Sequence, residues 1–376
     1  METIPTLWAE PHGHLHRDRL RREASGYACR HAVPLAPDAL RERLARLREK
    51  LWTMLALDQP EHPPDIEEHG SVACDGYAVH RISFASGPGI RVTGNLYRPD
   101  GNGPFPAVLN LHGHWSQGKL AAQVQARGHV LARSGFVVLT VDAAGSGERS
   151  DAEREWSYHG AAKAAELLLS GDSLLALQVR DNRRALDVLQ SLPGVDPERI
   201  GATGASGGGN QTMWLSALDE RVKAAVPVVS VGSFAAYVGA RNCMCETLPG
   251  GLNLAEEWEV LGLIAPRPLL IVNALHDQPA FGYEALSATC RNLQEVYLMQ
   301  HARNRLDWRI LDMEHGYHPP VLHLMRDWMA HWLKNEPASP EGLPDWNPIA
   351  EAELLCYPPG RRPDACGYRA VRETLH

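Results

Sequence analysis

The chain has 376 residues, 44% of them hydrophobic and 22% charged, which is the composition of a globular protein large enough for one α/β domain or two smaller ones. Its net charge is −8, from 37 Lys and Arg against 45 Asp and Glu, and basic residues are concentrated only in the N-terminal segment. This balance argues against a nucleic-acid partner. The sequence has no signal-peptide core and no run of about 18 apolar residues, so we expect a cytoplasmic protein without a membrane partner.

The seven cysteines are too scattered for a zinc ribbon or a small disulfide scaffold. We expect them to be reduced and mostly buried. Only Cys243 and Cys245 lie close together in the sequence. A Cys-x-Cys pair with no second pair nearby is poor geometry for a metal ion, so we predict no metal site here.

The first predicted element is an amphipathic helix over residues 37–57. Its leucines recur every three or four positions with charged residues between them, and Asp38 follows a proline at the start. The apolar stripe consists of Leu40, Leu44, Leu47, Leu51 and Leu55. We expect this helix to pack on the core of the following domain, as part of an N-terminal extension that spans residues 1–71.

Eight segments predict strands. Residues 77–84 and 90–99 alternate in polarity, which is typical of an antiparallel edge. The later segments are nearly continuous Val, Ile, Leu and Ala, separated by helix-length gaps, at residues 105–114, 135–145, 199–206, 223–230, 267–275 and 306–313. Such strands are buried on both faces of a parallel sheet, covered by helices such as residues 173–192 and 319–333. The predicted fold class is α/β, with a mostly parallel central sheet flanked by helices.

Residues 231–263 form a long segment between the sixth and seventh predicted strands. The segment is interrupted by Leu-Pro-Gly-Gly-Leu and carries Phe234, Tyr237 and Trp258. We expect it to form a partial lid over the strand ends. The catalytic domain is expected to cover residues 72–334, and residues 335–376 are expected to form a solvated C-terminal tail.

A glycine-rich stretch, RIGATGASGGGNQ at residues 199–211, follows a predicted strand and opens a predicted helix. It is not a Walker phosphate loop, because Asn210 and Gln211 stand where a lysine and a hydroxyl residue would follow the glycines, and it lacks the glycine spacing of a dinucleotide-binding loop. It matches G-x-S-x-G with Ser206 at its centre. Since such a sharp turn strains the serine and requires small neighbours, we predict a nucleophile elbow.

A serine hydroxyl is a weak nucleophile, so it needs an imidazole to accept its proton and a carboxylate to orient that imidazole. In this architecture the acid follows a later strand and the histidine follows the last one. Asp277 follows the strand at residues 267–275, and His315 follows the strand at residues 306–313, with His318 three residues further on. This order predicts a catalytic triad of Ser206, Asp277 and His315.

Acyl transfer also needs backbone N–H groups that stabilise the developing oxyanion. Gly207 follows the serine, and Gly113 and His114 leave the strand at residues 105–114. We predict that these residues supply the oxyanion hole. For His112 and Asp142, which end neighbouring strands, we predict structural hydrogen bonds to loop backbone.

The substrate pocket is predicted from aromatic and amide side chains near the strand ends. Trp115 and Gln117 follow the predicted oxyanion loop, and Tyr237 and Trp258 lie in the predicted lid. We expect these four side chains to line the pocket.

Together these segments resemble the α/β-hydrolase superfamily, and within it the acetyl xylan esterase-like branch, which is related to dienelactone hydrolases and prolyl oligopeptidases. The resemblance rests on HGHWSQGK, VDAAGSGER, GASGGGNQT, CMCETLPGG, IAPRPLLIVNALHD and EHGYHPPVLHLMRDWM, and covers about Val72 to Lys334. It implies a Ser206, Asp277 and His315 triad that acts on carboxylic esters, often the acetyl esters of plant polysaccharides, without a cofactor.

The chain also departs from these relatives. It has a serine where dienelactone hydrolases have a cysteine, and it lacks the R-G-Q element of the multispecific deacetylases and a secretory signal. We therefore expect a small ester or an oligosaccharide ester as the substrate. Glucuronoyl esterases, another branch, can take the triad acid from the loop after the sixth strand, which makes Glu246 a reserve candidate. Their G-C-S-R-x-G-K elbow is missing, so Asp277 is preferred.

The predicted function is that of a serine carboxylic-ester hydrolase that acts through an acyl-enzyme. The alternatives are a hydrolase of the same fold that cleaves an amide or a carbon–carbon bond, a glucuronoyl or methyl esterase, and, more remotely, a binding protein without turnover. The N-terminal helix and the tail are compatible with a homo-oligomer.

Overall fold

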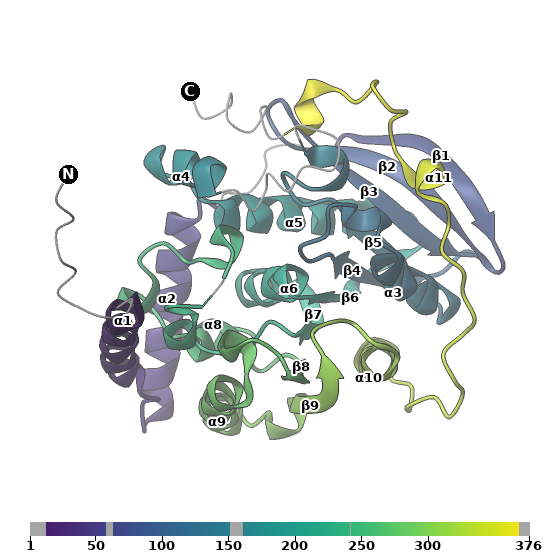
Figure 1. Cartoon of the computed structure of the whole chain (residues 1–376). Helices are drawn as coiled ribbons and strands as arrows, with labels where there is room; N and C mark the ends of the chain where they lie inside the picture. The colour runs from purple at the N-terminus through teal and green to yellow at the C-terminus, as the bar shows by residue number, and fades with distance from the viewer. Residues whose placement is uncertain (1–12, 58–62, 151–160, 241, 368–376) are drawn as a thin grey trace, which may run out of the picture.

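The computed structural model of the chain describes residues 13–57, 63–150, 161–240 and 242–367. Residues 1–12 and 58–62 of the predicted N-terminal extension and residues 368–376 of the predicted tail lie outside this description. A nine-stranded sheet in the order β1-β2-β3-β5-β4-β6-β7-β8-β9 runs through the centre of the protein (Figure 1). Its strands are β1 (Ile66–Cys74), β2 (Tyr77–Gly87), β3 (Ile90–Pro99), β4 (Phe105–Leu111), β5 (Val137–Val141), β6 (Val195–Ala205), β7 (Val222–Val228), β8 (Leu269–His276) and β9 (Leu306–Glu314).

The sheet is antiparallel at one end and parallel over the rest. Strands β1, β2, β3 and β5 pair antiparallel in succession, and every pairing from β5 through β4 to β9 is parallel. The predicted α/β class and antiparallel edge are therefore confirmed. The sequence missed β1, because none of its residues is buried and its polar side chains carry no strand pattern. Residues 231–263 consequently lie between β7 and β8.

Helices cover both faces of the sheet. Alternate residues of β8 divide between two clusters: Leu270 and Val272 pack with α3 and α10, whereas Leu269 and Ile271 pack with the helices of the opposite face. The helices are α1 (Gly13–Ala28), α2 (Pro37–Met54), α3 (Ala122–Arg133), α4 (Ala161–Leu169), α5 (Leu174–Ser191), α6 (Gly207–Leu218), α7 (Phe234–Tyr237), α8 (Glu257–Gly262), α9 (Tyr283–Met299), α10 (Pro319–Met329) and α11 (Glu351–Leu354). This double cover explains why the central strands are apolar throughout.

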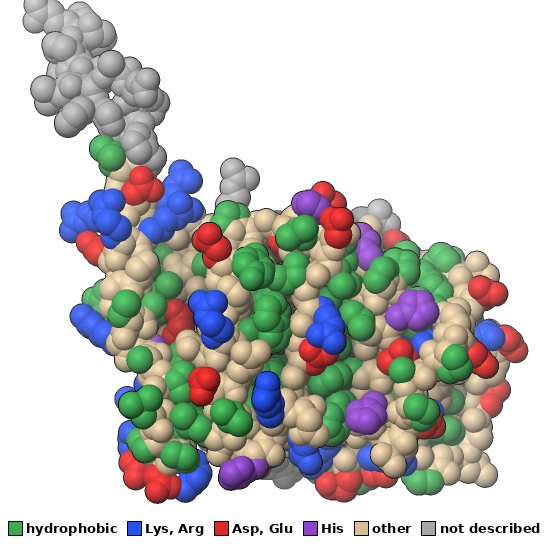
Figure 2. All heavy atoms as spheres, turned by 90° about the horizontal axis from the view of Figure 1, so that it is seen from below, with side chains coloured by type: hydrophobic (Ala, Val, Ile, Leu, Met, Phe, Trp, Pro, Cys, Tyr) green, Lys and Arg blue, Asp and Glu red, His purple; other side chains and the backbone are tan. Residues whose placement is uncertain are grey.

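Strand β9 is less buried than the other parallel strands. It forms the edge of the sheet beside β8, and none of its residues is fully buried. Trp308 and Ile310 pack on the cluster of one face and Leu311 and Met313 on that of the other, so the predicted cover of both faces is present but incomplete at this edge of the sheet. From the direction of β9, α9 and α10, acidic and basic side chains are interspersed over the surface (Figure 2). No helix in the described ranges is long and apolar enough to cross a membrane.

Helix α2 packs on the domain as its leucine stripe predicts. The five leucines of the stripe are at most 6% exposed and join the cluster formed by α6, α8 and α9. Burial of a leucine side chain contributes about 1.5 to 3 kcal/mol, so this stripe binds the N-terminal region firmly to the core.

The C-terminal region is packed, so the expectation of a solvated tail was wrong for its described part. Leu354, Cys356 and Cys366 are buried. The backbone N–H groups of Cys356 and Tyr357 donate hydrogen bonds to the Glu148 carboxylate at 3.0 and 2.9 Å. These bonds fix the tail to the loop that follows β5.

His129 lies where the sheet, α3 and the tail pack together. It is fully buried, its ring stacks on Trp346, and Tyr77 donates a hydrogen bond to its Nδ1 atom at 2.5 Å. Burial lowers the pKa of His129 from 6.5 to about 4. Between these values the unfolded chain binds a proton that the folded chain does not, so stability falls as the pH falls.

Because of this proton, we expect the free energy of unfolding to be about 2 kcal/mol lower at pH 5 than at pH 7. Urea unfolding at the two pH values measures it. The His129→Gln variant is expected to lose this part of the pH dependence, and the exposed His16→Gln variant is expected to keep it. Equal pH dependence in all three proteins would contradict the assignment.

Candidate active site

Ser206 lies at the sharp turn between β6 and α6. Its backbone has φ +58° and ψ −126°, a conformation that costs a non-glycine residue about 1 to 3 kcal/mol. Hydrogen bonds on both sides hold it there, because the Ser206 N–H donates to Val228 O at 2.9 Å and the Asn210 N–H donates to Ser206 O at 2.9 Å. The turn therefore has the geometry that the G-x-S-x-G pattern predicts.

The glycines around the turn are required by close backbone contacts. A Cβ atom on Gly204 would lie 2.4 Å from Leu111 O, and one on Gly208 would lie 2.2 Å from the same oxygen. No real Cβ atom makes such a contact. The end of β4 thus lies directly against the β6–α6 turn, and only glycine fits between them.

Asp277 and His315 form a hydrogen-bonded pair at the carboxyl ends of β8 and β9. The Nδ1 atom of His315 lies 3.0 and 2.9 Å from the two carboxylate oxygens of Asp277. The Asp277 side chain is 2% exposed and also accepts a hydrogen bond from the Gln278 N–H at 2.7 Å. A proton on Nδ1 leaves Nε2 of the neutral ring as an acceptor. His318 is not part of this pair, since its Nε2 atom contacts Glu314 O.

The predicted oxyanion loop lies against the serine turn. A Cβ atom on Gly113 would lie 2.6 Å from Ala205 O and 3.1 Å from the Ser206 Cβ. Gly207 begins α6, where backbone N–H groups have no partner within the helix. The same Cβ position on Gly113 lies 3.5 Å from Gly207 N, so the structure brings Gly113 and Gly207 together beside Ser206.

His112 fixes this loop by two hydrogen bonds, as predicted. Its Nε2 atom accepts from the Ala143 N–H at 3.0 Å, so Nδ1 carries the proton and donates to Gly113 O at 2.7 Å. Burial lowers the pKa of His112, which favours this neutral form. Gln211 supports the same loop, because its side-chain amide donates a hydrogen bond to His112 O at 3.1 Å.

Asp142 has the predicted structural role. Its carboxylate accepts hydrogen bonds from the backbone N–H of Lys119 at 2.9 Å and of Glu148 at 3.3 Å. It also forms an ion pair at 2.6 Å with the buried Lys119 ammonium. Burial alone would raise the pKa of Asp142, but Lys119 and His112 outweigh it and the pKa is lowered.

The reserve acid, Glu246, lies against a different histidine. Its Oε1 atom is 3.9 Å from His114 Nε2, and its Oε2 atom accepts from the Cys243 N–H at 3.1 Å. Burial raises the pKa of Glu246. The structure places Asp277, and not Glu246, within hydrogen-bond distance of His315.

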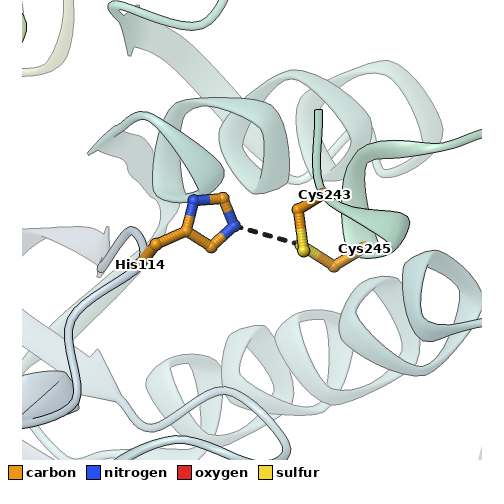
Figure 3. A group of neighbouring side chains, drawn as sticks. All are labelled: His114, Cys243 and Cys245. Atoms are coloured by element: carbon orange, nitrogen blue, oxygen red, sulfur yellow. Dashed lines mark hydrogen bonds between the residues drawn. The ribbon is translucent and has the colours of Figure 1, made fainter. Parts of the chain in front are cut away.

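The side chain of His114 forms a cluster that the sequence did not predict. Its ring lies against Gly207, where a Cβ atom would be 2.9 Å from Nε2, and Nε2 is 3.3 Å from Cys245 Sγ. Cys243 completes the group (Figure 3). Burial lowers the pKa of His114, but Cys243 and Glu246 outweigh it and the pKa is raised. The signal in the sequence was weak, because the His-Gly-His and Cys-Met-Cys motifs are more than 120 residues apart.

The predicted pocket residues lie in four different places. Trp115 is 40% exposed beside the oxyanion loop. Gln117 lines a cavity of about 440 Å³ between that loop and the C-terminal tail. Tyr237 lines another, of about 480 Å³, under α1, and Glu246 lines it too. Trp258 is fully buried in the core, where its indole N–H donates to His31 O, so its assignment to the pocket was wrong.

The turn at Ser206, the acid–histidine pair and the mostly parallel sheet are those of an α/β-hydrolase fold, and the match to an esterase family makes the protein a carboxylic ester hydrolase. The profile of the acetyl xylan esterase family, AXE1, matches residues 52–235. YtaP of Bacillus subtilis (strain 168), which is named a hydrolase, is 30% identical over 216 residues, or 53% of this chain and 69% of YtaP. The chain belongs to the acetyl xylan esterase family.

Solved structures show the same fold. The methylesterase BT1017 has a TM-score of 0.67 at 23% identity, with 92% of this chain and 72% of that chain covered. BF1801 of Bacteroides fragilis NCTC 9343, named as an acetyl xylan esterase, has a TM-score of 0.65 at 18% identity, with 81% of this chain and 83% of that chain covered.

Replacement of Asp277 tests the acid–histidine pair. In Asp277→Asn the amide favours the other tautomer of His315, so we expect kcat to fall by about 10³- to 10⁴-fold with little change in KM. The matched control is Asp312→Asn, because Asp312 forms an exposed pair with His276 at the ends of the same two strands. A loss of less than about tenfold in Asp277→Asn would exclude Asp277 as the orienting acid.

Replacement of Gly113 tests the oxyanion loop. The added methyl group collides with Ala205 O and must displace the loop, so we expect Gly113→Ala to lower kcat by about 10²- to 10³-fold. In Gly262→Ala the methyl group meets its nearest atom at 3.6 Å, an ordinary contact, and activity should be unchanged. Steady-state kinetics with unfolding curves for both variants separate a displaced loop from a destabilised fold.

Proposed function

We propose that the protein is a serine esterase that works through an acyl-enzyme, with Ser206 as nucleophile, His315 as general base and Asp277 as the orienting acid. The hydrogen bond between His315 Nδ1 and Asp277, at 2.9 Å, carries this proposal. It leaves Nε2 as the atom that accepts the serine proton, and the strained turn exposes the hydroxyl to a substrate carbonyl.

The reaction takes two steps. His315 accepts the proton of Ser206 while the serine oxygen attacks the ester carbonyl, and the N–H groups of Gly207 and of Gly113 or His114 bind the oxyanion. His315 then donates the proton to the leaving alcohol, and an acyl-enzyme remains. A water molecule, deprotonated by His315, releases the carboxylic acid and restores the serine.

The proposed substrate is a short-chain acyl ester or an ester of a small saccharide. The family of acetyl xylan esterases supports an acetyl group, and the likeness to a methylesterase makes a methyl ester the second candidate. Trp115, half exposed beside the proposed oxyanion hole, offers an aromatic face of the kind that saccharide rings stack on.

Turnover of p-nitrophenyl acetate, butyrate and octanoate tests the proposed chemistry. We expect the wild type to hydrolyse the shorter esters and to be labelled by a fluorophosphonate. In Ser206→Ala the nucleophile is missing, so kcat should fall by about 10⁴-fold or more and labelling should disappear. The control is Ser191→Ala, because Ser191 is the last residue of α5 and its hydroxyl donates to Val188 O.

The same assay separates the alternatives. Matched amides and diketones identify amide or carbon–carbon bond cleavage, and methyl glucuronate and acetylated xylose distinguish the two ester classes. A wild type that is inert towards all of these and unlabelled would point to a binding protein and overturn the proposal.

A further inference from the structure

Three metal-binding side chains from two distant segments meet beside the serine turn. His114 lies in the loop after β4, and Cys243 and Cys245 lie in the turn after α7. The ligand atoms of the three residues lie within 4.8 Å of one another (Figure 3). In the figure, the side chains of Cys243 and Cys245 both extend towards the His114 ring, and the dashed line joins that ring to a thiol.

The spacing fits a tetrahedral zinc ion. With Zn–S bonds of about 2.3 Å and a Zn–N bond of about 2.1 Å, tetrahedral angles place the nitrogen about 3.6 Å from each sulfur and the sulfurs about 3.8 Å apart. The observed distance from His114 Nε2 to Cys245 Sγ is 3.3 Å. Small side-chain rotations are therefore enough for coordination.

The surroundings also fit a cation. Cys245 is 1% exposed, and the backbone around Cys243 is held by the Glu246 carboxylate, so the two sulfurs are supported by a fixed turn. Binding of Zn²⁺ releases the two thiol protons, and the resulting site of two thiolates, one neutral imidazole and one dication carries no net charge. A neutral complex of this kind has a smaller desolvation cost than an isolated buried charge.

From this geometry we propose that His114, Cys243 and Cys245 bind a soft divalent cation, with Zn²⁺ as the preferred ion. Thiolate and imidazole ligands select zinc over magnesium or calcium. Three protein ligands leave the fourth position to a water molecule, and Glu246, 3.9 Å from His114 Nε2, accepts a hydrogen bond from it. Glu246 also lines the cavity of about 480 Å³ under α1.

The site has a structural consequence for the serine turn. His114 is itself one of the proposed oxyanion residues, and its ring lies against Gly207. An ion bound to His114 joins the loop after β4 to residues 243–246 and holds it in place. The ion needs no part in the ester chemistry, so binding can be tested separately from activity.

Metal binding is measured on full-length Ser206→Ala protein, stripped by a chelator and kept under a phosphine reductant. We expect one Zn²⁺ per chain in competition with a chromophoric chelator, and Co²⁺ is expected to give a thiolate-to-cobalt charge-transfer band and tetrahedral d–d bands. Because Ser206 is absent, a failed esterase hypothesis leaves this result unaffected.

Cys243→Ser and Cys245→Ser should each weaken Zn²⁺ binding by about 100-fold or more and remove or shift the charge-transfer band. Cys29→Ser, which removes an exposed thiol outside the group, should bind as the parent does. Urea unfolding of the stripped variants establishes that they are folded. Absence of the charge-transfer band in the parent, unchanged affinity in both variants, or a Cys243–Cys245 disulfide under reductant would each overturn the proposal.

Discussion

The candidate site depends on how closely three backbone segments approach one another at Ser206. The end of β4, the end of β6 and the first turn of α6 meet where neither Gly204 nor Gly208 has room for a Cβ atom. This packing, together with the hydrogen bond from Ser206 N to Val228 O, keeps the serine in its strained conformation. The strain of about 1 to 3 kcal/mol is offset by the sheet around it, so the hydroxyl is already in position before a substrate arrives.

A buried ionic cluster fixes the loops that surround this turn. The Lys119 ammonium contacts both Asp142 and Glu148, and all three side chains are at most 5% exposed. These two carboxylates outweigh the effect of burial and raise the pKa of Lys119. Loss of one partner would leave an uncompensated buried charge, which costs about 3 to 5 kcal/mol. Since Glu148 also binds the backbone of Cys356, the tail contributes to the rigidity of the loop after β4.

The sequence was sufficient for features that are local or periodic. Continuous apolar runs identified the buried strands, and the glycines around Ser206 identified its turn. Strand β1 was not predicted because none of its residues is buried. Trp258 was wrongly assigned to the pocket because residue type alone does not say which way an aromatic ring points. The meeting of His114 with Cys243 depends on the relative position of two loops far apart in the chain, and no periodicity encodes that distance.

Two histidines of the candidate site each have an acid beside them, and the ring atoms that face these acids separate their roles. His315 meets Asp277 through Nδ1, so its Nε2 remains available as an acceptor. Nε2 of His114 lies 3.9 Å from Glu246 Oε1 and 3.3 Å from Cys245 Sγ, and it is also the ring atom closest to where a Cβ on Gly207 would be. An imidazole whose Nε2 already contacts a thiol is poorly placed to take the serine proton. The same contact suits a ligand to a cation. We therefore assign the proposed proton transfer to His315 with Asp277, and the proposed support of the loop to His114 with its neighbouring thiols.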